Sequence, residues 1–254
     1  MHPFARPSLP TERLILALDL DDTTQALTWA QRLQGRLTWV KVGSKLFTAG
    51  GPPFIRALLD LGFRVFLDLK YHDIPDVVAG AVREATRLGV SMVTLHASGS
   101  RTMLEQAARA GQETAEALGT TRPLLLGVTV LTSLGSDELA LLGLGSDAGL
   151  VVDRLATLAM NAGLDGIVCS PLEIERVRAR HPQAVILTPG IRPAPTEAPS
   201  GQPLPADDQV RVATPADALR RGADYLVVGR PILRAPDPLS ALTRMLETFP
   251  GGHP

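Results

Sequence analysis

Short apolar segments alternate with amphipathic segments along the whole chain, and this alternation limits the possible folds most strongly. The apolar, strand-like runs are 14–18, 37–42, 65–67, 92–95, 124–130, 166–168, 185–187 and 225–228. The helix-like segments between and after them are 24–34, 53–61, 76–88, 101–117, 148–162, 171–180, 215–221 and 237–247. Alternating strands and helices indicate a parallel sheet. Eight such units in 254 residues predict an α/β fold, a (β/α)8 TIM barrel forming one domain over residues 1–254.

A doubly wound open sheet is the alternative architecture for this pattern. That fold usually carries a GxGxxG turn after its first strand, and no such turn follows residue 18. The units are also evenly spaced, with no composition that suggests a linker between two domains. The closed barrel is therefore favoured.

The segment 66–76, FLDLKYHDIPD, places two carboxylates and an ammonium group within six residues. Side chains on a strand alternate between its faces, so Asp68 and Lys70 are expected to point the same way, with Asp73 beyond the strand end. The plainer interpretation is a surface ion pair at the end of a strand, which would contribute only about 0–1 kcal/mol.

Lysine is rare in this chain, which favours a chemical role for the lysines that remain. Of 25 basic residues only Lys41, Lys45 and Lys70 are lysines, and two of them lie where strands are predicted to end. Arginine keeps its proton at any working pH, whereas a lysine can donate one. With so few lysines, chance placement remains the alternative.

Polar residues recur at the carboxyl ends of the predicted strands, where barrel enzymes carry their chemistry. They are Asp19, Lys41, Asp68, Lys70, His96, Thr132, Ser133, Ser170, Arg192 and Arg230. We expect them to form one ring around the mouth of the barrel. Taken alone, His96 could simply orient a loop, and Cys169 is expected to be a small core residue.

Composition argues against several classes of partner. The net charge is −1 and the pI is about 6.5, so neither nucleic acid nor an anionic membrane is an expected partner, and the ligand should be a small molecule. No apolar run approaches the roughly 18 residues of a membrane span, and the first residues, MHPFARPSLPTER, lack the apolar region of a signal peptide. One cysteine excludes an internal disulfide, so we expect a cytoplasmic protein.

The segment 193–208 is a long proline-rich stretch, with five prolines between Arg192 and Gln209. Loops of this length in compact domains are usually functional or disordered, so we expect an active-site loop; an inert linker is the alternative. Gly229 and Arg230 follow the eighth strand beside it. Barrels commonly bind phosphate after strands seven and eight, and a guanidinium suits phosphate oxygens.

These motifs together resemble orotidine 5'-phosphate decarboxylase, in its longer bacterial type. The matching blocks, in order, are ALDLDD, VKVGSKLF, FLDLKYHDIPD, TLHASGS, GVTVLTS, DGIVCS, TPGIRP, DDQVRVATPADAL and GADYLVVGRPI. The resemblance implies conversion of orotidine 5'-phosphate to uridine 5'-phosphate and CO2 in pyrimidine (UMP) biosynthesis. It implies no cofactor and no metal. The stretch from Pro193 to Asp208 is longer and richer in proline than the family pattern.

The resemblance also implies roles for individual residues. Lys70 would protonate C6 of the pyrimidine beside Asp68 and Lys41, and Asp73 would complete this array in the partner site of a homodimer. Asp19 and Lys41 would bind ribose hydroxyls, with Thr132 nearby. Gln209 would bridge base and phosphate, and Gly229, Arg230 and Arg192 would hold the phosphate. The remaining substrate contacts would come from Leu69, Tyr71, His72, Ile74, Pro75, Asp76 and Val77.

Three other functions remain open at this point. A related barrel group with the same DxKxxD pattern uses Mg²⁺ to decarboxylate or join sugar phosphates, but the strand ends show no convincing additional glutamate. A class I aldolase could form a Schiff base at Lys41 or Lys70. A phosphate-binding barrel without catalysis would not need so costly a charge cluster.

Overall fold

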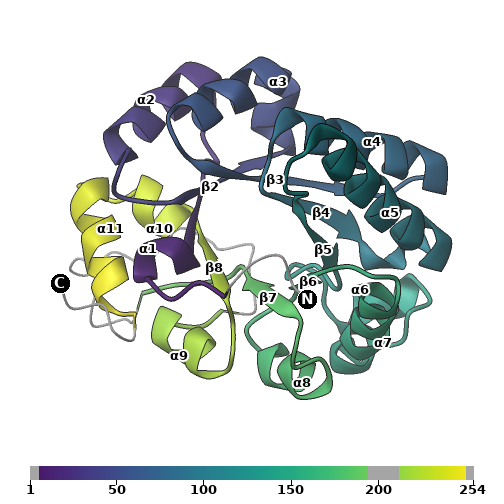
Figure 1. The fold of residues 1–254 in the computed structure, drawn as a ribbon. Helices are drawn as coiled ribbons and strands as arrows, with labels where there is room; N and C mark the ends of the chain where they lie inside the picture. Colours follow the sequence, from purple (N-terminus) through teal and green to yellow (C-terminus); the bar gives the residue numbers. More distant parts are fainter. Residues whose placement is uncertain (1–5, 194–211, 250–254) are drawn as a thin grey trace.

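A computed structural model describes residues 6–193 and 212–249, and its core is a closed barrel of eight parallel strands (Figure 1). The strands neighbour one another in chain order, from β1 through β8 and back to β1. They are β1 Leu14–Ala17, β2 Trp39–Gly43, β3 Arg64–Tyr71, β4 Met92–His96, β5 Leu124–Val128, β6 Gly166–Val168, β7 Val185–Thr188 and β8 Tyr225–Val228. The predicted (β/α)8 barrel is confirmed, and each predicted strand overlaps an observed one.

Helices surround the barrel on its outside (Figure 1). They are α1 Pro10–Arg13, α2 Thr23–Leu33, α3 Ser44–Asp60, α4 Pro75–Leu88, the 3-10 turn η1 Ala97–Gly99, α5 Arg101–Leu118, α6 Ser136–Leu141, α7 Ala148–Asn161, α8 Ile174–Arg180, α9 Pro215–Arg220, α10 Arg230–Leu233 and α11 Pro238–Glu247. All eight predicted helices are present, whereas α1, η1, α6 and α10 were not predicted. None of the described helices is long and apolar enough to cross a membrane.

Helix α3 is longer than the predicted segment 53–61 because it consists of two helical pieces joined at a kink. Gly51 has φ 56°, a left-handed conformation that ends the first piece. Pro52 and Pro53 then begin the second piece, where a missing backbone N–H costs least. The two prolines correctly indicated where the second piece begins, but the first piece, before Gly51, was not predicted.

The strands separate two hydrophobic cores. Side chains pointing inward fill the barrel: Ile15, Ala17, Trp39, Phe66, Met92, Leu124, Leu126, Val185, Leu187, Tyr225 and Val227. Inside this core the rings of Trp39 and Tyr225 meet edge to face, with centroids 5.5 Å apart. The larger core lies between the strands and the helices. The filled interior gives the barrel a rigid, dry floor beneath the strand ends.

Two aspartates secure the end of the barrel at which the strands begin. Asp165, just before β6, accepts hydrogen bonds from the guanidinium of Arg122 (2.6 Å) and from the N–H of Leu125 in β5 (2.8 Å). Asp224, just before β8, is similarly bound by Arg178 (2.7 Å) and by the N–H of Ile186 in β7 (2.8 Å). Each aspartate therefore ties the start of its own strand to the neighbouring strand that precedes it in the chain.

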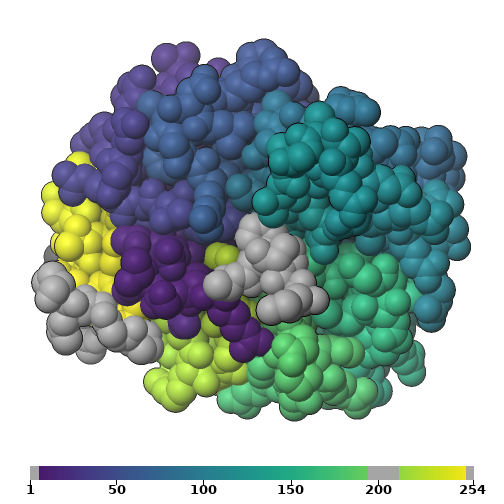
Figure 2. Space-filling model, viewed as in Figure 1, coloured from purple at the N-terminus to yellow at the C-terminus, as the bar shows by residue number. Residues whose placement is uncertain are grey.

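Helix α1 belongs to the same end, because it leads directly into β1 at Leu14. Its residues lie on the surface of the face shown in Figure 2. The polar strand ends described below lie at the opposite end of the barrel, since all eight strands run in parallel.

Replacing Asp165 with alanine should destabilise the protein by about 3 kcal/mol, because the largely buried Arg122 guanidinium would lose its counter-charge. Urea unfolding would measure this loss. Glu84→Ala is the matched control: it removes a carboxylate whose partner, Arg87, is exposed, and should cost less than about 1 kcal/mol. Equal effects of the two substitutions would show that Asp165 is not a structural anchor.

Candidate active site

Strand β3 carries the central charged residues of the site to the mouth of the barrel. Its lower half supplies the core residue Phe66, and the next inward positions are Asp68 and Lys70. Their side chains reach the same cavity, and Lys70 Nζ lies 2.9 Å from both carboxylate oxygens of Asp68. The expected common orientation of the pair is therefore confirmed. Asp73 lies beyond the strand end, as expected.

The backbone of β3 is irregular at Lys70. Its pairing with β4 shifts between Leu67 and Tyr71: over this stretch β3 advances four residues while β4 advances two, from Val93 to Leu95. Lys70 itself has φ 50°, in the left-handed region that non-glycine residues rarely occupy. Such a conformation costs on the order of 1–3 kcal/mol and persists only where surrounding contacts hold it.

Asp68 is the centre of the hydrogen-bonded array. Besides Lys70, its carboxylate accepts a hydrogen bond from Thr94 Oγ1 on β4 at 2.9 Å and lies 3.4 Å from Lys41 Nζ on β2. Only 12% of its side chain is exposed. Three neighbouring strands therefore converge on one buried carboxylate.

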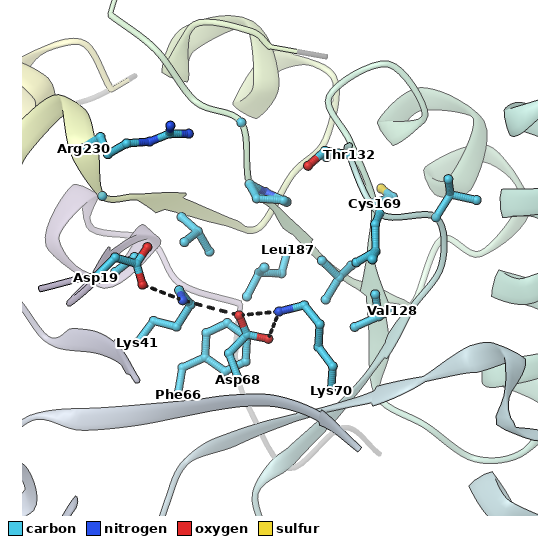
Figure 3. A pocket seen from close by; sticks show the side chains of 18 of the residues that line it. Asp19, Lys41, Phe66, Asp68, Lys70, Val128, Thr132, Cys169, Leu187 and Arg230 are labelled. Atoms are coloured by element: carbon cyan, nitrogen blue, oxygen red, sulfur yellow. Dashed lines mark hydrogen bonds and ion pairs between the residues drawn. The ribbon is translucent and has the colours of Figure 1, made fainter. Parts of the chain in front are cut away.

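Lys41 links this carboxylate to a second one. Its Nζ also lies 3.3 Å from Asp19 Oδ1, just beyond β1, so that negative and positive groups alternate in the order Asp19, Lys41, Asp68 and Lys70 (Figure 3). Gly43 leaves space for the ammonium group, because a Cβ at that position would lie 3.3 Å from Lys41 Nζ.

Burial and charge act in opposite directions on these groups. Burial alone would favour the neutral forms, but the attraction of Asp68 and Asp19 outweighs it and raises the pKa of Lys41 above its ordinary value. For Asp68, burial is likewise outweighed by Lys41, by Lys70 and by the hydrogen bond from Thr94, which together lower its pKa. Both groups are consequently charged at neutral pH.

A cavity of about 230 Å³ opens above this array. The row of charged side chains lies along one side of it, and Arg230 and Thr132 lie apart from Lys70, farther along the rim (Figure 3). The remaining wall is largely apolar and comes from Ala17, Phe66, Val128, Val130, Leu131, Val168, Cys169, Leu187, Pro189 and Val227. The cavity thus joins a charged side to an apolar wall and a cationic rim.

The cationic rim comes from the ends of β7 and β8. Arg230 is the first residue of the short helix α10, and Gly229 before it keeps the rim open, because a Cβ there would lie 3.3 Å from the Cβ of Ala17. Arg192 follows β7, and its N–H bonds the carbonyl of Ala213 at 2.9 Å. This bond joins the two described ends of the chain on either side of 194–211.

Several residues expected to contact substrate do not line this cavity within the described single chain. Leu69 and Tyr71 pack against the outer core. His72, Asp73, Ile74, Pro75, Asp76 and Val77 lie in the loop after β3 and in the first turn of α4. Gln209 and residues 194–208 of the predicted loop lie outside the described residues.

The predicted ring of polar residues is correct only in part. Ser170 is fully buried, and its hydroxyl donates a hydrogen bond to the carboxylate of Glu173. Because of the turn formed there, α8 begins at Ile174 and not, as predicted, at residue 171. His96 lies against His72, with ring centroids 5.3 Å apart, and Ser133 is exposed. None of these three is among the described residues lining the cavity.

Two features of the site were missed in the sequence. One is the apolar wall, in which Cys169 is both buried, as expected, and part of the cavity lining. The other is Thr94, a polar residue at an inward position of β4. The only signal was its spacing of two residues from Met92 and from His96, which places all three on one face of the strand.

Among residues 6–193 and 212–249, no group of three or more His, Cys, Asp or Glu side chains is placed to hold a metal ion. The two carboxylates of the array, Asp19 and Asp68, instead have ammonium groups as their close cationic neighbours.

Comparison with known proteins identifies the family. Residues 12–245 match the model of the orotidine 5'-phosphate decarboxylase / HUMPS family. Orotidine 5'-phosphate decarboxylases from Opitutus terrae and Nitrosomonas eutropha are each 48% identical to this chain, over 92% and 91% of it and 96% and 94% of their own lengths. The crystal structure of orotidine 5'-phosphate decarboxylase from Lactobacillus acidophilus superposes with a TM-score of 0.80 at 34% identity, covering 94% of this chain and 99% of that one. This chain therefore belongs to the orotidine 5'-phosphate decarboxylase / HUMPS family.

Proposed function

We propose that the protein converts orotidine 5'-phosphate to uridine 5'-phosphate and CO2, the decarboxylation that completes the synthesis of UMP. The observation that carries this proposal is the ammonium group of Lys70, held 2.9 Å from the buried carboxylate of Asp68 at the edge of the cavity. The family relationship supports the same reaction.

The charge array suits the loss of CO2 from a ring carbon. When the bond from C6 to the carboxylate breaks, its electron pair stays on C6, which has no adjacent group to accept it. A fixed ammonium group stabilises such a centre by electrostatics. Lys70 then transfers one N–H proton to C6, and its neutral amine regains a proton from solvent.

The alternating array keeps Lys70 in place for this transfer. Asp68 is ionised because Lys41, Lys70 and Thr94 all stabilise its charged form, so it binds the ammonium group rather than sharing a proton with a neutral amine. The largely apolar wall on the opposite side of the cavity offers water few hydrogen-bonding partners. Fixed charges act more strongly in such a low-dielectric site.

The cationic rim suits the phosphate of a nucleotide. Arg230 and Arg192 can donate paired N–H groups to phosphate oxygens, and Gly229 leaves the backbone accessible. A phosphate bound this far from the reacting carbon contributes binding energy that orients the pyrimidine. We assign Asp19 and Lys41 to the ribose hydroxyls, Thr132 to the neighbouring rim, and Gln209 to base and phosphate.

We also propose a homodimer in which Asp73 of one subunit completes the array of the other. Asp73 is exposed beyond β3, and nearby Ile74 and Val77 at the start of α4 are apolar and 65% and 49% exposed. A second subunit covering this surface would bury both side chains. It would also bring the substrate contacts proposed for the loop, from His72 onward, to the partner's cavity.

No cofactor takes part in this scheme, and we place the enzyme in the cytoplasm. The first test is the change in ultraviolet absorbance as orotidine 5'-phosphate is consumed, with excess chelator present. Conversion to uridine 5'-phosphate supports the proposal. Activity that appears only with added Mg²⁺ and a sugar phosphate would contradict it.

Lys70→Ala should lower kcat by at least about 10²–10⁴-fold, because it removes the proton donor and the stabilising charge. Uridine 5'-phosphate should still bind, since the cationic rim is intact; calorimetry would measure its affinity. Lys45→Ala is the matched control, because Lys45 is 64% exposed and pairs with Asp21 outside the cavity. A Lys70→Ala enzyme with near wild-type kcat would disprove the proton-donor role.

Mixing inactive Lys70→Ala and Asp73→Ala proteins should restore activity if Asp73 acts across the dimer. Random exchange makes half of the dimers mixed, and each mixed dimer has one intact site, so about a quarter of wild-type activity is expected. Native mass spectrometry would establish that exchange occurred. Full exchange without recovery would place both residues in one subunit's site.

A further inference from the structure

We propose that Thr94 is a positioning residue for the decarboxylation: its hydroxyl clamps the irregular end of β3 and thereby fixes the Lys70 ammonium against Asp68. The inference rests on the proposed function. Thr94 does not line the cavity and is fully buried, so it acts through Asp68 and Lys70 rather than on the substrate.

The clamp consists of two hydrogen bonds made by one hydroxyl. Thr94 Oγ1 accepts a hydrogen bond from the backbone N–H of Lys70 at 3.0 Å and donates one to Asp68 Oδ1 at 2.9 Å. A threonine hydroxyl has one proton to donate and lone pairs to accept with. The directions of both hydrogen bonds are therefore determined. The single hydroxyl proton goes to the carboxylate of Asp68, so the hydroxyl oxygen can only accept from the N–H of Lys70.

The backbone needs this acceptor because of the irregular pairing at Lys70. The shift in register between Leu67 and Tyr71 interrupts the regular ladder between β3 and β4, and Lys70 takes up a left-handed conformation within the interruption. A buried N–H without an acceptor is costly. The hydroxyl of Thr94 supplies the acceptor from β4, the strand against which the ladder is interrupted.

The same hydroxyl couples backbone to side chain. Lys70 is bound at its N–H by Thr94 and at its Nζ by Asp68, and Asp68 is in turn bound by Thr94. These three bonds form a closed ring through three residues. Loss of the hydroxyl would open the ring at two points: the N–H of Lys70 would lose its acceptor, and Asp68 Oδ1 would keep only the hydrogen bond from Lys70 Nζ.

Thr94→Val tests the clamp, because it keeps the shape of the side chain and removes the hydroxyl. We expect kcat to fall about 10²-fold, the effect of a misplacement of the Lys70 ammonium group by roughly 1 Å. KM should change by less than about threefold, because the cationic rim is untouched. Thr94→Ser should keep kcat within about tenfold of wild type. Thr86→Val is the matched control: Thr86 is a buried threonine of α4 whose hydroxyl bonds Val82 within the helix, and its loss should leave kcat unchanged.

The pH profile separates positioning from general destabilisation. The hydrogen bond from Thr94 lowers the pKa of Asp68, so its loss should move the acid limb of the kcat profile of Thr94→Val to higher pH. Thr94→Ser and Thr86→Val should leave that limb in place. If Thr94→Val does not fold, Thr94→Ser and Thr94→Ala provide the same comparison, since they differ only in the hydroxyl.

A kcat for Thr94→Val within about threefold of wild type would overturn the inference, as would a Thr94→Ser enzyme no better than Thr94→Ala. A crystal structure of Thr94→Val tests the clamp independently of activity. We expect Lys70 to leave the left-handed region or its Nζ to move away from Asp68; an unchanged Lys70 would refute the clamp. An inactive wild-type protein would instead refute the proposed function, while the crystal structure would still decide the clamp.

Discussion

The buried carboxylate of Asp68 is the group on which the rest of the site depends. It meets Lys70 from its own strand, Lys41 from β2 and Thr94 from β4, so three neighbouring strands must be in register for it to be satisfied. Removing any one partner would leave charge or hydrogen-bonding capacity unpaired in a largely buried position, which is costly. The array is thus held together by the barrel rather than by its own attraction alone.

The closed barrel supplies that rigidity from below. Inward-pointing side chains such as Trp39, Phe66 and Met92 fill the interior beneath the charged row, so the strand ends cannot collapse toward one another. At the other end, Asp165 and Asp224 tie strands together at the points where they begin. The apolar wall of the cavity then completes a site in which charges are fixed and water is limited, the condition under which electrostatic stabilisation is most effective.

The sequence predicted the barrel and the row of charges well because both follow from simple periodicities. Alternating strands and helices have a clear pattern, and the two-residue spacing of Asp68 and Lys70 places them on one face of a strand. The left-handed backbone at Lys70 has no such signal, because lysine does not favour that conformation and only tertiary contacts impose it. Thr94 was overlooked for the same reason: its role depends on an irregularity in the neighbouring strand, not on its own surroundings in the sequence.

The most direct test of this account is the titration of Lys41, followed by NMR of protein labelled with isotope only in lysine. Three lysines give three resolvable side chains. If an ionised Asp68 lies against Lys41, the pKa of Lys41 exceeds its ordinary value of 10.5. The stabilisation from this pair is then complete below pH 10.5 and is lost as the pH rises through the higher value. Asp68→Asn should lower that pKa. A Lys41 that loses its proton below pH 10.5 in the folded wild-type protein would show that burial outweighs the array, and would contradict the account.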